Sequence, residues 1–521
     1  MSATGMTLHQ EIEVKLEAGR DFTVPDLTSI RGVASASEPV EHPLDATYYD
    51  TTALDLMQAR MTLRHRVGGK DEGWHLKLPG TGPGSSWVGT SNRTELAFPL
   101  GDDLPDELSE LIRGVTRGCP VVPVASIRTL RTIVELRDEA GTALVELADD
   151  AVDTEVFGDV GVPRTTAGSP SWRELEVELL SGDEDTVRLA AARLTKAGAK
   201  AAASPSKLAS ALAAAGRAPL RASPTGTEPN RRSSAQEVVL RGLARHRDAL
   251  VGADVGLRLG SPESLHASRA AARRLRSALT VFRALFEVEP VDRLLKGLRA
   301  MDKVLQPVRD NDVLLARLTS EIGEEPAEFA RPAEVLLRRA LADRNATAWE
   351  DVEVWLDRPQ ALRLIHRLDA FLAEPPLDRS QHGQAGRLLP AMIAGAWSRV
   401  RKLADIALAD PEDVKALERV RRAAKSVRYA AELAGTALGD AAIVFAAAVE
   451  EIQEVLGEHR NALLVGEFLV ALAADVRTSG RAGFLYGRLH AVAGANVLSA
   501  VDDFTDAWDR ADDGELISWL R

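Results

Sequence analysis

The sequence predicts an α+β protein of two domains, an antiparallel β-barrel with a few helices followed by an all-helical domain. Short alternating stretches of apolar and polar residues, separated by turn-forming segments, fill residues 6–213 and are typical of strands. Apolar residues recur at helical spacing through residues 235–519. Residues 214–234 are rich in Pro, Gly, Ser and Thr without any period, which is typical of a linker.

The composition excludes several classes of protein. The chain has 521 residues, of which 45% are hydrophobic, so it can form large cores. Its net charge is −13 and its aromatic content 4%, which disfavours a nucleic-acid partner on electrostatic and stacking grounds. A single cysteine, Cys119, excludes an internal disulfide framework and fits a reducing compartment. No apolar run is long enough to span a membrane and no signal pattern opens the chain, so we expect a cytoplasmic protein.

Charged side chains alternate with aliphatic ones along the predicted strands. Glu11, Glu13 and Lys15 fall on one face of a strand because side chains point to opposite sides at successive positions. A solvent-facing surface explains any one such strand. The same pattern recurs in Arg64 with Arg66, His75 with Lys77, Arg93 with Glu95, and Glu174 with Glu176 and Glu178. This repetition of acidic and basic groups favours faces that line one channel, which would suit a polyanion together with divalent cations.

These residues carry a resemblance to a known family. The segment Glu11-Ile12-Glu13-Val14-Lys15 resembles the ExExK signature of the CYTH domain, also called the triphosphate tunnel metalloenzymes. Matching segments follow in the family's order over residues 6–213, namely Tyr48-Tyr49-Asp50-Thr51, Leu63-Arg64-His65-Arg66, Leu76-Lys77-Leu78, Arg93-Thr94-Glu95, Arg131, Asp149, Glu174-Leu175-Glu176-Val177-Glu178 and Ser206-Lys207. The resemblance implies an eight-stranded antiparallel barrel around a tunnel, which hydrolyses triphosphates or cyclises nucleotides with Mg²⁺ or Mn²⁺.

The resemblance also implies roles for individual residues. The phosphate-binding residues would be Lys15, Arg64, Arg66, Lys77, Arg93, Arg131 and Lys207. The metal ligands would be Glu11, Glu13, Glu174 and Glu176, with Glu95, Asp149 and Glu178 as further ligands or their neighbours. The catalytic set would be Glu11, Glu13 and Lys15. Two positions stay open, since Glu146 competes with Asp149, and Arg128 with Arg131, for the inward face of a regular strand.

The helical half contains a duplicated basic stripe. His266, Arg269, Arg273 and Arg276 are spaced by 3, 4 and 3 residues and fall on one helix face. Glu418, Arg421, Lys425 and Arg428 repeat this spacing 152 residues later. The segments 304–310 and 455–461 also match, at an offset of 151. A solvated basic face explains one such stripe, but the duplication favours a site and predicts two pseudo-symmetric four-helix bundles.

This half resembles the CHAD domain, from about Gln236 to Trp519. The matching segments are His266-x-x-Arg269-x-x-x-Arg273-Arg274-Leu275-Arg276, Val308-Arg309-Asp310-Asn311-Asp312-Val313 and Arg421-Arg422-Ala423-Ala424-Lys425-Ser426-Val427-Arg428-Tyr429. The resemblance implies that a basic groove binds inorganic polyphosphate through Arg269, Arg273, Arg276, Arg421, Lys425 and Arg428, with His266 either structural or a phosphate contact. Glu418 stands where the second motif usually has His, so we expect weaker anion binding at that edge or an internal pair with Arg422.

The two resemblances together predict a two-domain hydrolase. The barrel would cleave tripolyphosphate or short polyphosphate with Mg²⁺ or Mn²⁺, and the helical domain would bind longer polyphosphate and concentrate the enzyme on it. Alternatives are a thiamine triphosphatase, a nucleoside triphosphatase, an adenylate cyclase, or a polyphosphate-binding scaffold without catalysis. Association with polyphosphate granules and the oligomeric state are left open by the sequence.

Overall fold

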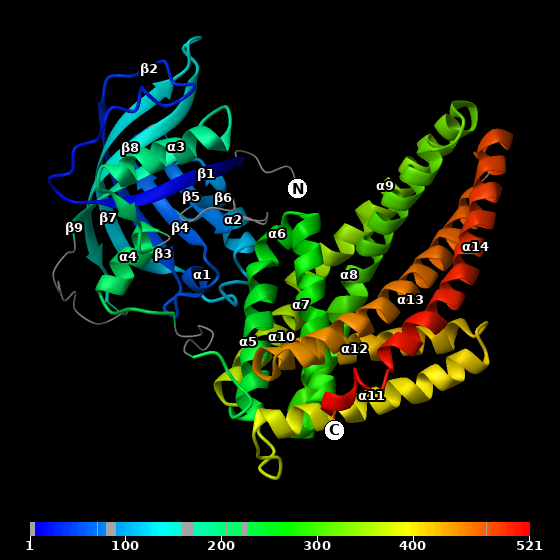
Figure 1. Cartoon of the computed structure of the whole chain (residues 1–521). Helices are drawn as coiled ribbons and strands as arrows, with labels where there is room; N and C mark the ends of the chain where they lie inside the picture. Colours follow the sequence, from blue (N-terminus) through cyan, green and yellow to red (C-terminus); the bar gives the residue numbers. More distant parts are fainter. Residues whose placement is uncertain are drawn as a thin grey trace. The chain divides into compact units, whose positions relative to one another are not determined.

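The computed structural model describes residues 6–69, 71–79, 90–158, 171–204, 206–219, 227–475 and 477–520. The chain divides into two compact units, Met1–Ala222 and Ser223–Arg521 (Figure 1). Within the described ranges, no helix is both long enough and apolar enough to cross a membrane.

The first unit is a closed antiparallel β-barrel, as predicted. Strand β9 pairs with β1 as well as with β8, which closes the sheet into a ring of eight strands. In order around the barrel these are β1 (Thr7–Ala18), β6 (Thr90–Phe98), β5 (Gly73–Pro79), β4 (Thr62–Val67), β3 (Val40–Asp50), β7 (Val122–Arg137), β8 (Ala143–Val156) and β9 (Ser171–Leu179). Two short strands extend it, β2 (Ser35–Ala36) on β7 and β10 (Lys200–Ala201) on β1.

The alternation in β1 sorts charged residues inward and aliphatic residues outward. Val14 and Leu16 are buried in an apolar core that includes Val187 and Leu194 of the helix α3 (Glu184–Lys196), which covers the outside of the barrel. Across the β1–β9 ladder, Lys15 lies opposite Glu176. Paired residues of adjacent strands share a face, so the charged side chains of β1 and β9 point into the barrel interior together.

A short helix, α4 (Lys207–Ala214), carries one further cation into the barrel. Its N-cap is Ser206, whose hydroxyl accepts a hydrogen bond from the Ala209 backbone at 3.2 Å. Leu208 and Leu212 pack in an apolar cluster with β3, β7 and β8. This packing places Lys207, the first residue of α4, beside the carboxylates of β8 and β9. The remaining helices of the unit are α1 (Asp55–Gln58) and α2 (Asp106–Leu111).

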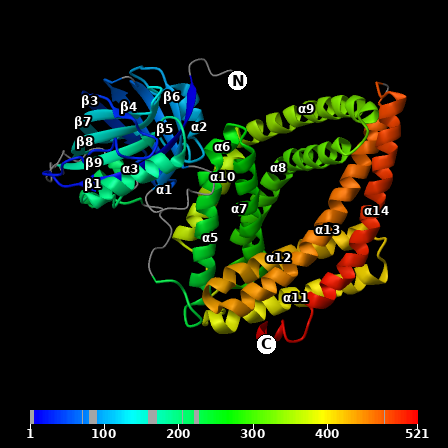
Figure 2. The ribbon, with the colours of Figure 1, turned by 45° about the horizontal axis from the view of Figure 1, so that its top comes forward.

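The second unit is all-helical, as predicted (Figures 1 and 2). Its helices are α5 (Ala235–Gly252), α6 (Asp254–Arg258), α7 (Pro262–Val281), α8 (Val288–Gly323), α9 (Ala327–Asp357), α10 (Pro359–Ala373), α11 (Ala385–Ala409), α12 (Val414–Leu438), α13 (Asp440–Ala473) and α14 (Gly480–Ala511), with 3₁₀ turns at Arg283–Leu285 and Ser518–Leu520. Figure 2 shows the long hairpins α8–α9 and α13–α14 meeting at their ends, where the rings of Phe329 and Phe484 contact each other at a tilt of 43°, with centroids 5.4 Å apart.

The helices repeat, but the apolar cores do not divide by repeat. Helices α7 and α12 begin 152 residues apart, at Pro262 and Val414, and α8 and α13 begin 152 residues apart as well. One continuous core draws on both halves, and a second core joins the far ends of α8, α9, α13 and α14. The two halves therefore stabilise each other across their interface, and each repeat does not have a core of its own.

Candidate active site and anion-binding groove

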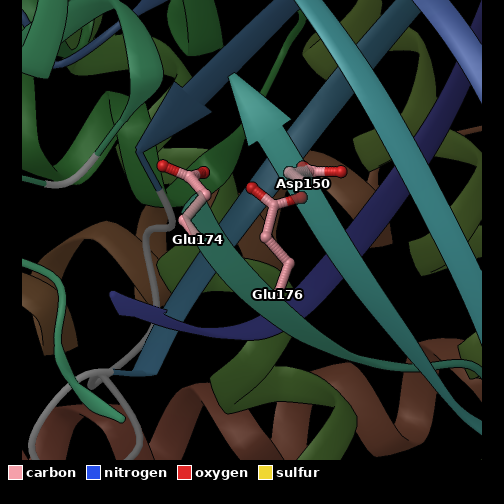
Figure 3. A group of neighbouring side chains, drawn as sticks. All are labelled: Asp150, Glu174 and Glu176. Carbon is pink, nitrogen blue, oxygen red and sulfur yellow. The ribbon is translucent and has the colours of Figure 1, made fainter. Parts of the chain in front are cut away.

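Three carboxylates meet inside the barrel. Asp150 on β8 and Glu174 and Glu176 on β9 each have an oxygen within 4.8 Å of the others (Figure 3). Asp150 lies opposite Glu174 in the β8–β9 ladder, so all three point to the same side of the sheet. They are 0%, 5% and 7% exposed respectively. Such a buried group of like charges is stable only with compensating cations.

Three cations surround this acidic cluster. The Lys207 ammonium lies 2.9 Å from Asp150, 2.7 Å from Glu174 and 2.8 Å from Glu176. Arg131 donates two hydrogen bonds to Asp150, at 2.8 and 2.7 Å, and also contacts Glu176. Lys15 donates to Glu176. Burial alone would raise the pKa of Glu176, but Lys15, Lys207 and Arg131 hold it well below its usual value, so this carboxylate is ionised at neutral pH.

A second charged cluster lies further along β1, β5 and β6. Lys77 is 2.5 Å from Glu11, and Glu95 contacts Nδ1 of His75 at 3.0 Å and Arg64 at 3.3 Å. Burial raises the pKa of Glu11 to about 7, although Lys77 opposes the shift. Burial alone would also raise the pKa of Glu95, but His75, Lys77 and Arg64 bring it below its usual value.

The remaining predicted barrel residues also lie on the inward face. Arg66 donates to the carboxylate of Asp71 at 2.8 Å, and Arg93 lies opposite Glu11 in the β1–β6 ladder. Glu178 lies opposite Glu13, and burial, with help from Glu11, raises the pKa of Glu178 to about 8. The barrel thus brings together every predicted phosphate-binding and metal-binding residue but one.

The exception is Asp149, whose predicted place the structure corrects. Its carboxylate accepts two hydrogen bonds from Arg173, at 2.8 and 2.7 Å, on the other face of β8. Asp150 takes the inward position instead. Of the open alternatives, Arg131 faces inward opposite Asp150, whereas Arg128 lies opposite Asp153. Glu146, the other open alternative, has the same strand parity as Asp150 and lies opposite Glu178, so it also faces inward.

The residues of the acidic cluster fit a divalent cation. Their donors are all carboxylate oxygens, the ligands that Mg²⁺ and Mn²⁺ prefer. Glu13, which is 3% exposed, adds an oxygen, Oε1, that has no hydrogen-bond partner among the described residues. A buried, unpaired carboxylate oxygen is costly unless a cation satisfies it, so the donor set suits a metal ion as well as the surrounding lysines.

The helical unit contains a basic cavity of about 630 Å³ between α7, α8, α12 and α13, which we call the groove. Ten cationic side chains line it, namely Arg269, Arg273, Arg276, Arg299, Lys303, Arg309, Arg421, Arg422, Lys425 and Arg460. Among the described residues, three acidic side chains line it, namely Asp302, Asp310 and Glu418. The groove is therefore strongly positive in a chain whose net charge is −13.

The acidic residues pair with some of these cations and leave others uncompensated. Asp302 pairs with Arg276 at 2.6 Å, and Asp310 pairs with Arg309 and Arg460 at 3.0 and 2.9 Å. No ion pair to a described residue is formed by Arg273, Arg299, Lys303 or Lys425.

Lys425 shows the effect of this excess charge. Burial lowers the pKa of Lys425 to about 7, and Arg421, Arg273 and Arg309 shift it in the same direction. Burial likewise lowers the pKa of Arg269 to about 10. The guanidinium of Arg269 donates a hydrogen bond to the Leu305 carbonyl at 3.1 Å. Close, unneutralised cations of this kind favour an anionic ligand.

The groove contains five of the seven residues predicted for polyphosphate binding, Arg269, Arg273, Arg276, Arg421 and Lys425. His266 is exposed on α7 and does not line it. Arg428 also lies outside its lining and pairs with Glu432 and Glu450, each at 2.7 Å.

The prediction missed the cations of the neighbouring helices. Arg299, Lys303 and Arg309 come from α8, and Arg460 comes from α13. Arg299 and Lys303 are four residues apart and so share a helix face, which was the signal available in the sequence.

Comparisons with known proteins agree with this architecture. The CYTH domain family matches residues 9–211 and the CHAD domain family matches residues 241–470. An uncharacterized protein of Mycobacterium tuberculosis, MT2285, is 31% identical over 502 residues, with 92% of each chain covered.

Two solved structures are similar to parts of the chain. The CHAD domain from the plant Ricinus communis is 23% identical, with 54% of this chain and 94% of that chain covered and a TM-score of 0.44. A putative adenylyl cyclase from Hippeastrum, described as having a dominant triphosphatase activity, is 18% identical, with 40% of this chain and 97% of that chain covered and a TM-score of 0.24.

The class of protein is thus a tunnel-type β-barrel joined to a helical domain with a basic groove. The chain belongs to the family in which a CYTH domain is followed by a CHAD domain.

Proposed function

We propose that the barrel is a divalent-metal-dependent triphosphatase that hydrolyses tripolyphosphate or short polyphosphate, and that the groove binds polyphosphate. The observation that carries the proposal is the joint presence, inside one closed barrel, of Asp150, Glu174 and Glu176 with Lys15, Arg131 and Lys207. Carboxylates that can hold a metal and cations that can hold phosphates are the two requirements for phosphoryl transfer.

The residues divide into two roles in this proposal. Lys15, Arg131 and Lys207 neutralise phosphate oxygens near the acidic cluster, while Arg64, Arg66, Lys77 and Arg93 hold the chain further along the barrel. Asp150, Glu174, Glu176, Glu13 and Glu11 hold Mg²⁺ or Mn²⁺, with Glu95 and Glu178 beside them. A metal ion held by these carboxylates would neutralise the charge that develops on the transferred phosphoryl group.

The groove supports the second half of the proposal. Ten cations and three carboxylates line it, so the negative charges of a phosphate chain can neutralise the cations that have no acidic partner. Binding of this kind releases counterions and weakens as salt rises. Tethering the barrel to a long polyphosphate raises the local concentration of chain ends without any new contact in the barrel.

A substrate panel on the full-length chain tests the proposal. We expect phosphate release from tripolyphosphate with Mg²⁺ or Mn²⁺ to exceed release from ATP and thiamine triphosphate, and chelation of the metal to abolish it. Glu13→Ala and Lys15→Ala should lower turnover by about two to four orders of magnitude while polyphosphate still binds. Cyclic AMP formed from ATP would instead indicate a cyclase. Polyphosphate binding without any phosphate release would indicate a scaffold.

A further inference from the structure

Glu418 breaks the repeat symmetry of the groove. It is the fifth residue of α12, as His266 is the fifth residue of α7. His266 is exposed and lies outside the lining of the groove, whereas Glu418 is one of the lining residues. The second repeat therefore places a carboxylate within an anion-binding surface at a position where the first repeat contributes nothing.

The Glu418 carboxylate occupies the two hydrogen-bond donors, Nε and Nη2, on one side of the Arg421 guanidinium. Its two oxygens accept hydrogen bonds from Nε and Nη2 of Arg421 at 2.7 and 2.9 Å. Its Oε1 also accepts from Nε of Arg422 at 2.6 Å. Arginine side chains form bidentate hydrogen bonds to phosphate through this same pair of nitrogens. Glu418 thus holds Arg421 in the way that a phosphate oxygen pair would.

The equivalent positions of the first repeat are not blocked. Arg269, which corresponds to Arg421, donates to the Leu305 carbonyl and has no carboxylate partner among the described residues. Arg273, which corresponds to Lys425, has a buried Nε without a hydrogen-bond partner. Among these groove residues, Arg269 and Arg273 of α7 therefore lack a described carboxylate partner, whereas Arg421 of α12 is paired with Glu418.

Glu418 stays ionised under ordinary conditions. Burial alone would raise its pKa, but Arg421 and Arg422 lower the pKa of Glu418 to about 2. A change of pH near neutrality does not release Arg421, so release requires a competing anion.

We propose that Glu418 is an internal competitor of the phosphate chain. It limits binding at Arg421, so that polyphosphate first engages the unpaired cations Arg269 and Arg273 of α7 and reaches Arg421 only by displacing this carboxylate. The inference rests on the proposed binding of polyphosphate by the groove and identifies the residue that restrains its affinity.

Helix α12 offers a matched control for this inference. Glu432 accepts from Arg428 at 2.7 Å with the same four-residue spacing that Glu418 has to Arg422. Glu432 does not line the groove. Glu432→Gln and Glu418→Gln change the net charge equally and each removes an ion pair within the helix. Glu432→Gln also removes a pair with Arg274 of α7, at 3.4 Å, but only Glu418→Gln removes a carboxylate from the groove.

Calorimetric titration of the full-length chain with linear polyphosphate of one length, at several salt concentrations and with a chelator to prevent hydrolysis, tests the inference. We expect Glu418→Gln to bind about tenfold more tightly than the unaltered chain. The slope of the logarithm of its affinity against the logarithm of the salt concentration should steepen by about 0.7. Glu418→His should also bind more tightly, and Glu432→Gln should match the unaltered chain. The double variant with Glu418→Gln and Arg273→Gln should lose the increase in polyphosphate affinity, because that increase depends on the groove.

The outcomes separate this inference from the proposed function. Unchanged or weaker binding by Glu418→Gln, while the unaltered chain binds polyphosphate, overturns the inference alone; lower stability of this variant in urea would then identify a helix-stabilising pair. Binding by Glu418→Gln but not by the unaltered chain supports the inference and refutes polyphosphate binding as the native role. Absence of binding by both chains refutes both.

Discussion

The barrel interior and the groove of the helical unit handle charge in opposite ways. Cations and carboxylates face one another in the described part of the barrel, namely Lys15, Arg64, Arg66, Lys77, Arg93, Arg131 and Lys207 with Glu11, Glu13, Glu95, Glu146, Asp150, Glu174, Glu176 and Glu178. Ten cations face only three carboxylates in the groove.

The difference follows from burial. The barrel encloses its charged groups, and uncompensated charge is too unfavourable in a buried interior to persist. Most groove cations keep contact with solvent, so their repulsion is partly screened. The comparison teaches that a polyanion can enter the groove directly, whereas in the barrel it must compete with carboxylates unless a metal ion neutralises them.

Two adjacent aspartates on β8 provide the test with the largest expected effect. Asp150→Asn removes a carboxylate of the acidic cluster, and we expect phosphate release to fall by about a hundredfold or more because a metal ligand is lost. Asp149→Asn should leave turnover unchanged and lower the free energy of unfolding by at most about 1 kcal/mol through loss of its partly exposed pair with Arg173.

Steady-state kinetics, direct titration with Mn²⁺ and urea denaturation of both variants check this pair. Equal loss of turnover in the two variants would show that the inward face of β8 has no special role. Unchanged Mn²⁺ affinity in Asp150→Asn would remove this residue from the metal site.

Arg273→Gln tests the groove's excess charge at an intermediate magnitude. This arginine has no acidic partner among the described side chains, so its loss leaves no carboxylate stranded. We expect polyphosphate affinity to fall about tenfold at low salt. The slope of the logarithm of affinity against the logarithm of the salt concentration should become shallower by about 0.7. Titration over a range of salt concentrations measures both, and a salt dependence that does not change would mean that Arg273 makes no phosphate contact.

We expect a smaller effect of pH on polyphosphate affinity, through Lys425. The charged groups that face it are Arg421 and Glu418 on α12, Arg273 on α7 and Arg309 on α8. Because the pKa of Lys425 is about 7 without ligand, and a bound polyanion would raise it, affinity should fall as pH rises from about 6 to about 8, by at most about tenfold.

Lys425→Arg is the matched control, since arginine stays charged throughout this range. Polyphosphate affinity of this variant, measured at each pH, should vary little. A pH dependence that persists in Lys425→Arg would place the titrating group elsewhere.

Strand parity explains both the success and the failure of prediction in the barrel. Glu11, Glu13 and Lys15 share parity, and so do Glu174 and Glu176, which was enough to place them on common faces. At Asp149 and Asp150 the local pattern offers an acid on each face, and only the pairing of β8 with β9, where Asp150 lies opposite Glu174, selects one.

The helical half shows the same limit. The spacing of Arg269, Arg273 and Arg276 marks a single face of α7, but the sequence does not state which neighbouring helix packs beside it. Arg299 and Lys303 join the groove because α8 packs against α7. Arg428 lies outside its lining, where the guanidinium pairs with Glu432 and Glu450.

The amino-acid sequence by itself determined the two kinds of architecture, the inward set of alternating charges and the duplicated basic stripe, because strand and helix periods are local properties of the chain. The tertiary structure decided which aspartate enters the barrel and which cations complete the groove. Those outcomes depend on the register of strands and the packing of helices that lie far apart in sequence, so contacts across the fold, and not local periodicity, set them.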